Sequence, residues 1–443
     1  MCIRDSRAEA LASKDTELLL VSLDHFYRAG ESAQMVSSTL ENIGAIETFG
    51  VPAIGLAALE RIDSLQLREE DRSRLAGATA RLLLGAGDYT RAMQNPLKGL
   101  LLPQMSTRPS EVEIDAALSF VDSTYRADPM IDREALMSFT ISVAELDYIS
   151  RPTRVRAADI GLVMASNECD AISAERVFVA ADISLPEINA DEYFGRTAIL
   201  YHTLFGDPSL AYQIANKLFE RSRISAATSI SYQDALRAGF SLRVIADGQL
   251  HLLALEHAFE IAQHLAAPTL GLNAAWLLSQ SYLELGETTR FRHWYSQVNR
   301  LFEQVAEPIV CNYAVGLFCR AAIEERSQPK ARAHLEVFSR NLPRRPALKT
   351  SSYALSLQMA VELLDPEWQP PVELVSALLV RQDRIGRFGT CDFLTSIAAE
   401  SLARVGRIHE AIALIRRYVG TQRRETCSLG VRLAKTSEAL ERE

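Results

Sequence analysis

The sequence predicts an all-α protein, a superhelical α-solenoid of about ten antiparallel helix pairs with a period near 40 residues. Apolar residues recur at positions i, i+3, i+4 and i+7 in segments of about 12 to 18 residues, which is the spacing of one helix face. No stretch shows the sustained two-residue alternation and β-branched enrichment that are typical of strands. Short breaks rich in Gly, Asp or Pro separate the segments at regular intervals.

The strongest breaks each begin with a glycine: GDYTRA at Gly87, GDPSLA at Gly206, GETTRF at Gly286 and GRIHEA at Gly406. These glycines are 119, 80 and 120 residues apart, close to three, two and three units of 40. Weaker turn signals mark the remaining boundaries between units, near Phe49, Ala127, Cys169, Gly248, Ser327 and Pro366.

Each break is expected to join two helices through a tight turn. Glycine ends the first helix, a residue two positions later packs across the turn, and a small residue five positions later lets the second helix approach closely. One helix pair cannot bury its apolar faces alone, whereas stacked pairs share a continuous core and form a superhelix. The packing and small positions hold Tyr89 with Ala92, Pro208 with Ala211, and Ile408 with Ala411.

The stretch AWLLSQSYLELGETTRFRHWYSQV resembles a tetratricopeptide repeat. Leu278, Tyr282, Gly286, Phe291 and Tyr295 occupy the Leu, Tyr, Gly, Ala and aromatic positions of that motif. LLLGAGDYTRAM and ESLARVGRIHEAIALI match its turn. Two features depart from the family pattern: Phe291 replaces the usual small residue, and the period is near 40 rather than about 34 residues.

The longer, degenerate repeat is similar to the superhelical signalling region of large bacterial LuxR-type, ATP-dependent transcriptional activators and related regulatory ATPases. This resemblance covers most of residues 16–420. It implies a cytoplasmic sensing arm, with an ATPase upstream and a DNA-binding domain at one end. No helix-turn-helix segment is recognisable before Glu443, and the chain has no Gly-Lys dipeptide with which a phosphate-binding loop would end.

The composition is that of a soluble globular protein, with 48% hydrophobic and 23% charged residues. The net charge of −9 comes from residues 1–150, which hold 14 basic and 23 acidic residues. Such a balance lacks a basic footprint, so we expect no direct nucleic-acid binding. Only six of the 47 basic residues are Lys, a bias that we attribute to a GC-rich bacterial genome.

Membrane and disulfide chemistry are not indicated. No apolar stretch approaches the ~20 residues of a membrane-spanning helix, so we expect no membrane contact. The six cysteines contain no CxxC pair, and no secretory signal precedes them. We therefore expect a reducing, cytoplasmic environment.

The first six residues, MCIRDS, do not belong to the helical pattern. They match the translation of a transposase recognition end used in sequencing-library adapters, so we interpret residues 1–6 as an artefact joined to a reading frame cut in its middle. Residues 7–425 form the predicted solenoid, with possible bends near 95–111 and 341–371, where prolines end helices. Residues 426–443 form a predicted C-terminal capping helix.

The chain lacks the common catalytic motifs. GxGxxG, GxSxG and HExxH do not occur, so we expect neither catalysis nor a cofactor. His257, Glu260 and His264 share one helix face, and two neighbours of the three have metal-ligand spacing. Because no further ligand closes a site, we interpret them as helix surface. The basic and aromatic segment RFRHWY (290–295) is interpreted as half core and half solvated face.

The tetratricopeptide resemblance implies a concave groove lined by the first helix of each pair, which is where such folds hold peptides or ligands. The expected partner is a protein, a peptide or a small effector on this concave face. The residues expected to line the groove are Arg74, Arg81, Asn273, Trp276, Gln280, Glu400 and Arg404.

The sequence therefore predicts a non-catalytic binding scaffold, the signalling arm of a larger bacterial regulatory protein truncated at its N-terminus. Two alternatives stay open at this point. The chain can be a complete stand-alone adapter, or an enzyme whose helix pairs close into an α/α toroid. A toroid enzyme is expected to carry Asp-rich or Trp-rich motifs at the start of its inner helices, and we find none.

Overall fold

Every regular element in the described part of the chain is an α-helix, which confirms the predicted all-α class. Residues 1–6, the predicted capping helix 426–443 and most of the predicted bend at 95–111 lie outside the described residues. The computed structural model describes residues 24–41, 52–62, 67–94, 109–127, 132–182, 192–245, 249–343, 345–385 and 391–421.

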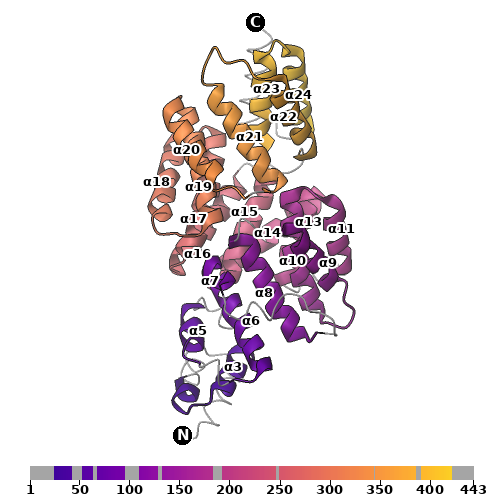
Figure 1. Cartoon of the computed structure of the whole chain (residues 1–443), viewed down its shortest axis with the longest axis vertical. Helices are drawn as coiled ribbons and strands as arrows, with labels where there is room; N and C mark the ends of the chain where they lie inside the picture. Colours follow the sequence, from indigo (N-terminus) through magenta and orange to yellow (C-terminus); the bar gives the residue numbers. More distant parts are fainter. Residues whose placement is uncertain are drawn as a thin grey trace.

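The helices form consecutive antiparallel pairs in which the first helix is usually the longer (Figure 1). α3 (Ser32–Glu41) and α5 (Pro52–Leu59) precede nine pairs: α6 (Glu69–Ala86) and α7 (Tyr89–Met93), α8 (Glu111–Ala127) and α9 (Arg133–Ala144), α10 (Arg151–Glu168) and α11 (Ala171–Ala180), α13 (Glu192–Leu204) and α14 (Pro208–Ile224), α15 (Ser229–Val244) and α16 (Leu250–His264), α17 (Pro268–Leu285) and α18 (Thr288–Phe302), α19 (Pro308–Glu324) and α20 (Gln328–Arg340), α21 (Leu348–Glu362) and α22 (Val372–Ile385), and α23 (Cys391–Arg404) and α24 (Ile408–Thr421).

The period near 40 residues is visible in both the helix bounds and the hydrogen bonds. The first helices of the nine pairs begin between 37 and 43 residues apart. Neighbouring first helices are joined by side chains at the same separation: Tyr125 bonds Asn167, 42 residues later, and Arg243 bonds Glu284, 41 residues later. The repeating unit is therefore a helix pair stacked on the next one, which is an α-solenoid of tetratricopeptide-like pairs.

The turn inside a pair uses a left-handed residue, as the glycine pattern predicts. Gly87, Gly286 and Gly406 have φ angles of 77°, 72° and 79°. Cys169 and Arg326 adopt the same conformation, each with φ of 55°, between the helices of two other pairs. The same turn geometry therefore occurs in five of the nine described pairs, including two whose turn residue is not glycine.

Gly206 differs from the other three predicted turn glycines, since its φ is not positive. It is required for space instead, because a Cβ atom there would lie 2.5 Å from Nδ1 of His202. The aspartates that follow these turns have a second role as N-caps. The side chains of Asp88, Asp170 and Asp207 accept hydrogen bonds from backbone N–H groups in the first turn of the second helix.

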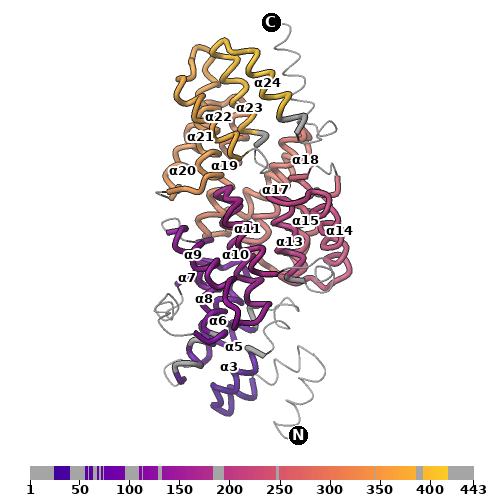
Figure 2. Tube along the Cα trace, turned by 90° about the vertical axis from the view of Figure 1, so that its right-hand side faces the viewer, coloured from indigo at the N-terminus to yellow at the C-terminus, as the bar shows by residue number. Residues whose placement is uncertain are grey.

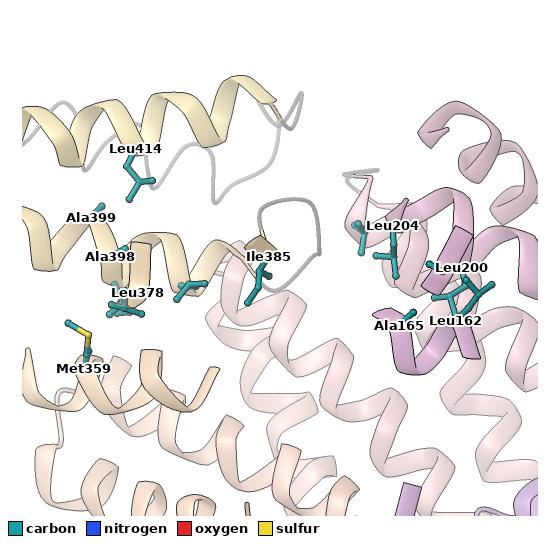
Figure 3. Packing of buried hydrophobic residues seen from close by; sticks show 14 of the residues in the cluster. Leu162, Ala165, Leu200, Leu204, Met359, Leu378, Ile385, Ala398, Ala399 and Leu414 are labelled. Carbon is teal, nitrogen blue, oxygen red and sulfur yellow. The ribbon is translucent and has the colours of Figure 1, made fainter. Parts of the chain in front are cut away.

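The pairs form an elongated superhelix with its first and last described helices at opposite ends (Figures 1 and 2). The described pairs therefore do not close into a ring, in contrast to the α/α toroid alternative. The chain curls so that helices far apart in sequence pack together, with α8 against α19 and α10 against α21. One apolar cluster contains residues of α9 to α13 together with residues of α21 to α24, part of which is shown in Figure 3.

Candidate ligand-binding cavity

The curl of the superhelix brings two parts of the chain face to face. We define the first arm as residues 69–182 and the second arm as residues 268–385. Polar contacts join the two arms directly. Thr90 donates through its backbone N–H and its hydroxyl to the carboxylate of Glu307, at 2.9 Å each. Lys349 Nζ donates to Ser166 Oγ at 2.9 Å.

A cavity of about 160 Å³ lies between the arms. Its walls combine phenols, amides, two guanidinium groups and apolar side chains, and neither Asp nor Glu is among the lining residues. First-arm residues on the wall are Tyr89, Tyr125, Arg126, Arg133, Val163 and Asn167. Second-arm residues on the wall are Asn273, Pro308, Ile309, Val310, Asn312, Tyr313, Asn341, Pro343, Ala347 and Thr350.

The N-terminus of α19 forms one wall. Pro308 occupies the first helical position, where its missing N–H costs nothing, and Ile309 and Val310 complete the first turn. The N-cap residue Glu307 makes no capping bond, because its carboxylate is held by Thr90 instead. The first turn of a helix carries N–H groups without intrahelical partners and a positive partial charge. The N–H groups of this wall therefore favour a negative charge, and one such charge, the carboxylate of Glu307, already lies at the N-cap.

The positive charge of Arg133, at the start of α9, is only partly compensated by nearby carbonyl and carboxylate oxygens. Its Nη1 donates to the carbonyl of Arg345 at 2.9 Å, and the nearest carboxylate oxygen, on Glu168, is 3.9 Å away. Its buried Nε has no hydrogen-bond partner within the described structure. Both guanidinium groups lie over a tyrosine ring, Arg133 over Tyr125 and Arg126 over Tyr89, but Arg126 differs because it is paired with Asp122 at 2.6 Å. Arg133 is thus the more available cation.

Phenols and amides supply the remaining polar wall. The amide of Asn167 donates to the phenol oxygen of Tyr125, and Asn273 lies near the phenol of Tyr232. Burial raises the pKa of Tyr313, while the charges of Arg133 and Arg126 oppose that rise, so both guanidinium groups lie near its phenol.

Asn312 is the least satisfied of the amides on the wall. Its residue surface is only 6% exposed, and its Oδ1 has no hydrogen-bond partner in the described structure. A buried polar atom without a partner is uncommon in native proteins, and it indicates a group that a ligand or a water satisfies.

The structure places two of the seven predicted groove residues at or beside this cavity. Asn273 lines it directly. Trp276 stacks on the lining residue Tyr313, with ring centroids 5.0 Å apart. Gln280, one turn further along the same face of α17, is buried, and its Oε1 has no partner in the described structure.

The other four predicted residues do not join them. Arg74 lies on α6, 3.8 Å from the carboxylate of Asp71. Arg81, on the same helix, is one of the charges that lower the pKa of Asp115 against the opposing effect of burial. Arg404 on α23 donates to the backbone carbonyls of Leu363, Asp365 and Pro366, and the exposed Glu400 lies 3.9 Å from it.

Sequence reasoning missed most of the wall. Tyr125, Arg126 and Arg133 lie at the end of one first helix and the start of its partner, which are not groove positions in the tetratricopeptide register. Tyr313 lies on the first helix α19, 40 residues after Asn273, so the extended register was the signal that pointed to it, whereas its neighbour Asn312 has no such signal.

Several other polar clusters inside the superhelix are internally paired. Asp159 accepts from both terminal nitrogens of Arg237, and Thr197 donates to it at 3.3 Å. Glu284 accepts from Arg243 at 2.7 Å and from Arg320 at 3.2 Å. These groups join first helices of different pairs, Glu284 to the two neighbouring pairs and Asp159 to Arg237 two pairs further along, and their charges are paired within the fold.

The remaining features identified in the sequence have structural partners. His257 and His264 contact backbone carbonyls of Ser222 and Glu260 through their rings, and no group of three potential metal ligands occurs among the described residues. Within RFRHWY, Trp294 is the buried residue and packs edge-on against Phe259. Burial raises the pKa of the Cys319 thiol to about 12, which keeps it protonated and unreactive.

Across the described residues, no helix combines the length and apolar character needed to cross a bilayer. Together, the stacked pairs and the interior cavity define a tetratricopeptide-like helical repeat scaffold. No family model matches the chain, and no curated protein matches it. Among solved structures, the crystal structure of yeast Tom70 matches over 99% of this chain and 95% of that one, at 12% identity and a TM-score of 0.35. That likeness is too distant to bear on what the chain binds.

Proposed function

We propose that the chain is a non-catalytic binding scaffold that holds a small effector on its concave face, in the cavity between the two arms. The observation that carries this proposal is the composition of the cavity wall, to which both arms contribute. The cavity volume of about 160 Å³ is below the roughly 300–1,000 Å³ of sites for drug-sized ligands, which favours a small molecule over a peptide.

A ligand in this position touches helices that are far apart in sequence, so its binding free energy stabilises one relative placement of the arms. That property suits a sensing module. The resemblance to the superhelical region of LuxR-type regulators supports the finer proposal that the chain is the signalling arm of a larger bacterial regulatory protein. The stand-alone adapter remains the alternative.

The proposal is tested with a thermal-shift screen of small metabolites that includes organic acids, sugars, amines and nucleosides. A ligand that binds only the folded state raises Tm. Val163→Phe fills the cavity from α10, and Val179→Phe adds the same volume at a position on α11 that is 64% exposed. We expect at least one compound to raise Tm of the wild type and of Val179→Phe but not of Val163→Phe.

Two results contradict the proposal. One is a panel in which no compound shifts Tm of the wild type. The other is a compound that stabilises Val163→Phe as strongly as the wild type, because such a compound binds outside the cavity.

A further inference from the structure

The charged and apolar residues that line the cavity indicate the chemical class of the ligand, which the cavity volume alone does not. Arg126 and Arg133 are the charged residues on the wall, and both are cations. The carboxylates that accompany them, on Asp122 and Glu168, are not among the lining residues. The charged lining side chains are therefore both positive, while the carboxylates of Asp122, Glu168 and the α19 N-cap residue Glu307 lie outside the lining.

One further observation points to an anion, and a second points to a ligand group or water that donates a hydrogen bond. The first turn of α19, a helix of 17 residues, borders the cavity at Ile309 and Val310 and has no side-chain N-cap bond. Asn312, one turn further along, is 94% buried by residue surface and keeps an amide oxygen without a partner in the described structure. A helix N-terminus and a partly compensated guanidinium, which attract an anion, thus line the same cavity as an amide oxygen, which accepts from a donor.

The rest of the wall is apolar. Val163 from the first arm and Ile309, Val310, Pro343 and Ala347 from the second arm present hydrocarbon surface. An inorganic anion would leave this surface in contact with water. A compact molecule with a charged end and an apolar body satisfies both parts of the wall.

We propose that the cavity binds a small organic acid, whose carboxylate is held by Arg133 at the N-terminus of α19 and whose apolar body packs against Val163 and Pro343. This inference rests on the proposed function and adds the chemical class of the effector. Arg133 presents two N–H groups in a plane, a geometry that matches a carboxylate better than a point charge does.

The inference is tested by isothermal titration with matched pairs of acids and neutral amides, benzoate with benzamide and hexanoate with hexanamide, and with inorganic phosphate. We expect at least one acid to bind at least tenfold more tightly than its amide, and more tightly than phosphate. Arg133→Gln is expected to weaken binding of that acid at least tenfold. Arg176→Gln, which removes an exposed arginine paired with Glu145 on the outer surface, is the matched control and should not change it.

A second variant controls for the possibility that Arg133→Gln weakens binding through misfolding. Arg133→Lys keeps the charge but not the planar donors, so we expect affinity between those of the wild type and Arg133→Gln, with all variants melting cooperatively. Equal affinities for acids and amides, preference for phosphate, or binding of neither series would each overturn the inference. Binding of neutral compounds alone, if Val163→Phe abolishes it, would also overturn the inference. That result would leave the proposed scaffold function intact.

Discussion

Two carboxylates that lie largely out of solvent, on Glu284 and Asp159, are held by arginines from other helix pairs. Burial alone would raise the pKa of Glu284, but the charges of Arg243 and Arg320 keep it below its ordinary value. Asp159 is in the same situation, with Arg237 as its main partner. Such pairs cost free energy to desolvate, and breaking one partner leaves a buried charge uncompensated.

Replacing Asp159 therefore has a predictable cost. We expect Asp159→Asn to lower the free energy of unfolding by about 3–5 kcal/mol, because the charge of Arg237 loses its partner in a largely buried position. Urea unfolding followed by circular dichroism measures the change.

The control for Asp159→Asn is Glu336→Gln, which removes an exposed carboxylate paired with Arg340. Its effect should stay within about 0.5 kcal/mol. Equal effects of the two substitutions would show that the inner pair contributes no more to stability than a surface pair does.

The sequence predicts some residues of the candidate cavity and not others, and the repeat register explains the difference. Asn273 and Trp276 follow from the repeat register, because the register places first-helix positions on the inner face. Arg126 and Arg133 have no such signal, since residues near 130 meet residues near 310 only through the curl of the whole superhelix. A 40-residue period does not tell which distant repeats come into contact.

Single helices and their turns are the best-predicted elements. The all-α class and the period near 40 residues are confirmed, because a helix face and a turn glycine are local features with local signals. The left-handed turns at Cys169 and Arg326 lack the glycine signal, although weaker breaks near Cys169 and Ser327 mark their positions in the sequence. Gly206 shows the reverse, a glycine retained for close approach to His202 rather than for its φ angle.

Gly286 offers a clean test of turn conformation. Its φ is 72°, and an added Cβ atom would meet nothing within 4 Å, so substitution is opposed by backbone strain alone. We expect Gly286→Ala to lower stability by about 1–2 kcal/mol. Gly286→Asn should cost less, because Asn tolerates the left-handed conformation at helix ends.

Thermal unfolding of the two Gly286 variants and of the wild type decides between strain and crowding. The order wild type, Asn, Ala in decreasing Tm is expected. If the Asn variant is the less stable of the two, then side-chain volume rather than the φ angle limits this position.

The contacts between the two arms belong to the whole molecule and do not follow from the repeat alone. The arms meet through polar contacts such as Thr90 with Glu307 and Lys349 with Ser166, and through the packing of α8 against α19 and α10 against α21. The cavity lies within this interface. A ligand there adds contacts to both arms at once, so its binding and the placement of the arms are thermodynamically linked.

The central claim is that one small ligand is held by both arms, and amide hydrogen exchange tests it most directly. The wild-type chain is compared with and without the compound that raises Tm most in the metabolite screen. Slower exchange is predicted together in residues 125–127 and 132–140 of the first arm and in residues 309–316 and 347–354 of the second arm, because a bound ligand suppresses opening of the helices that it contacts. Protection confined to one arm, or to the outer helices, would contradict the account.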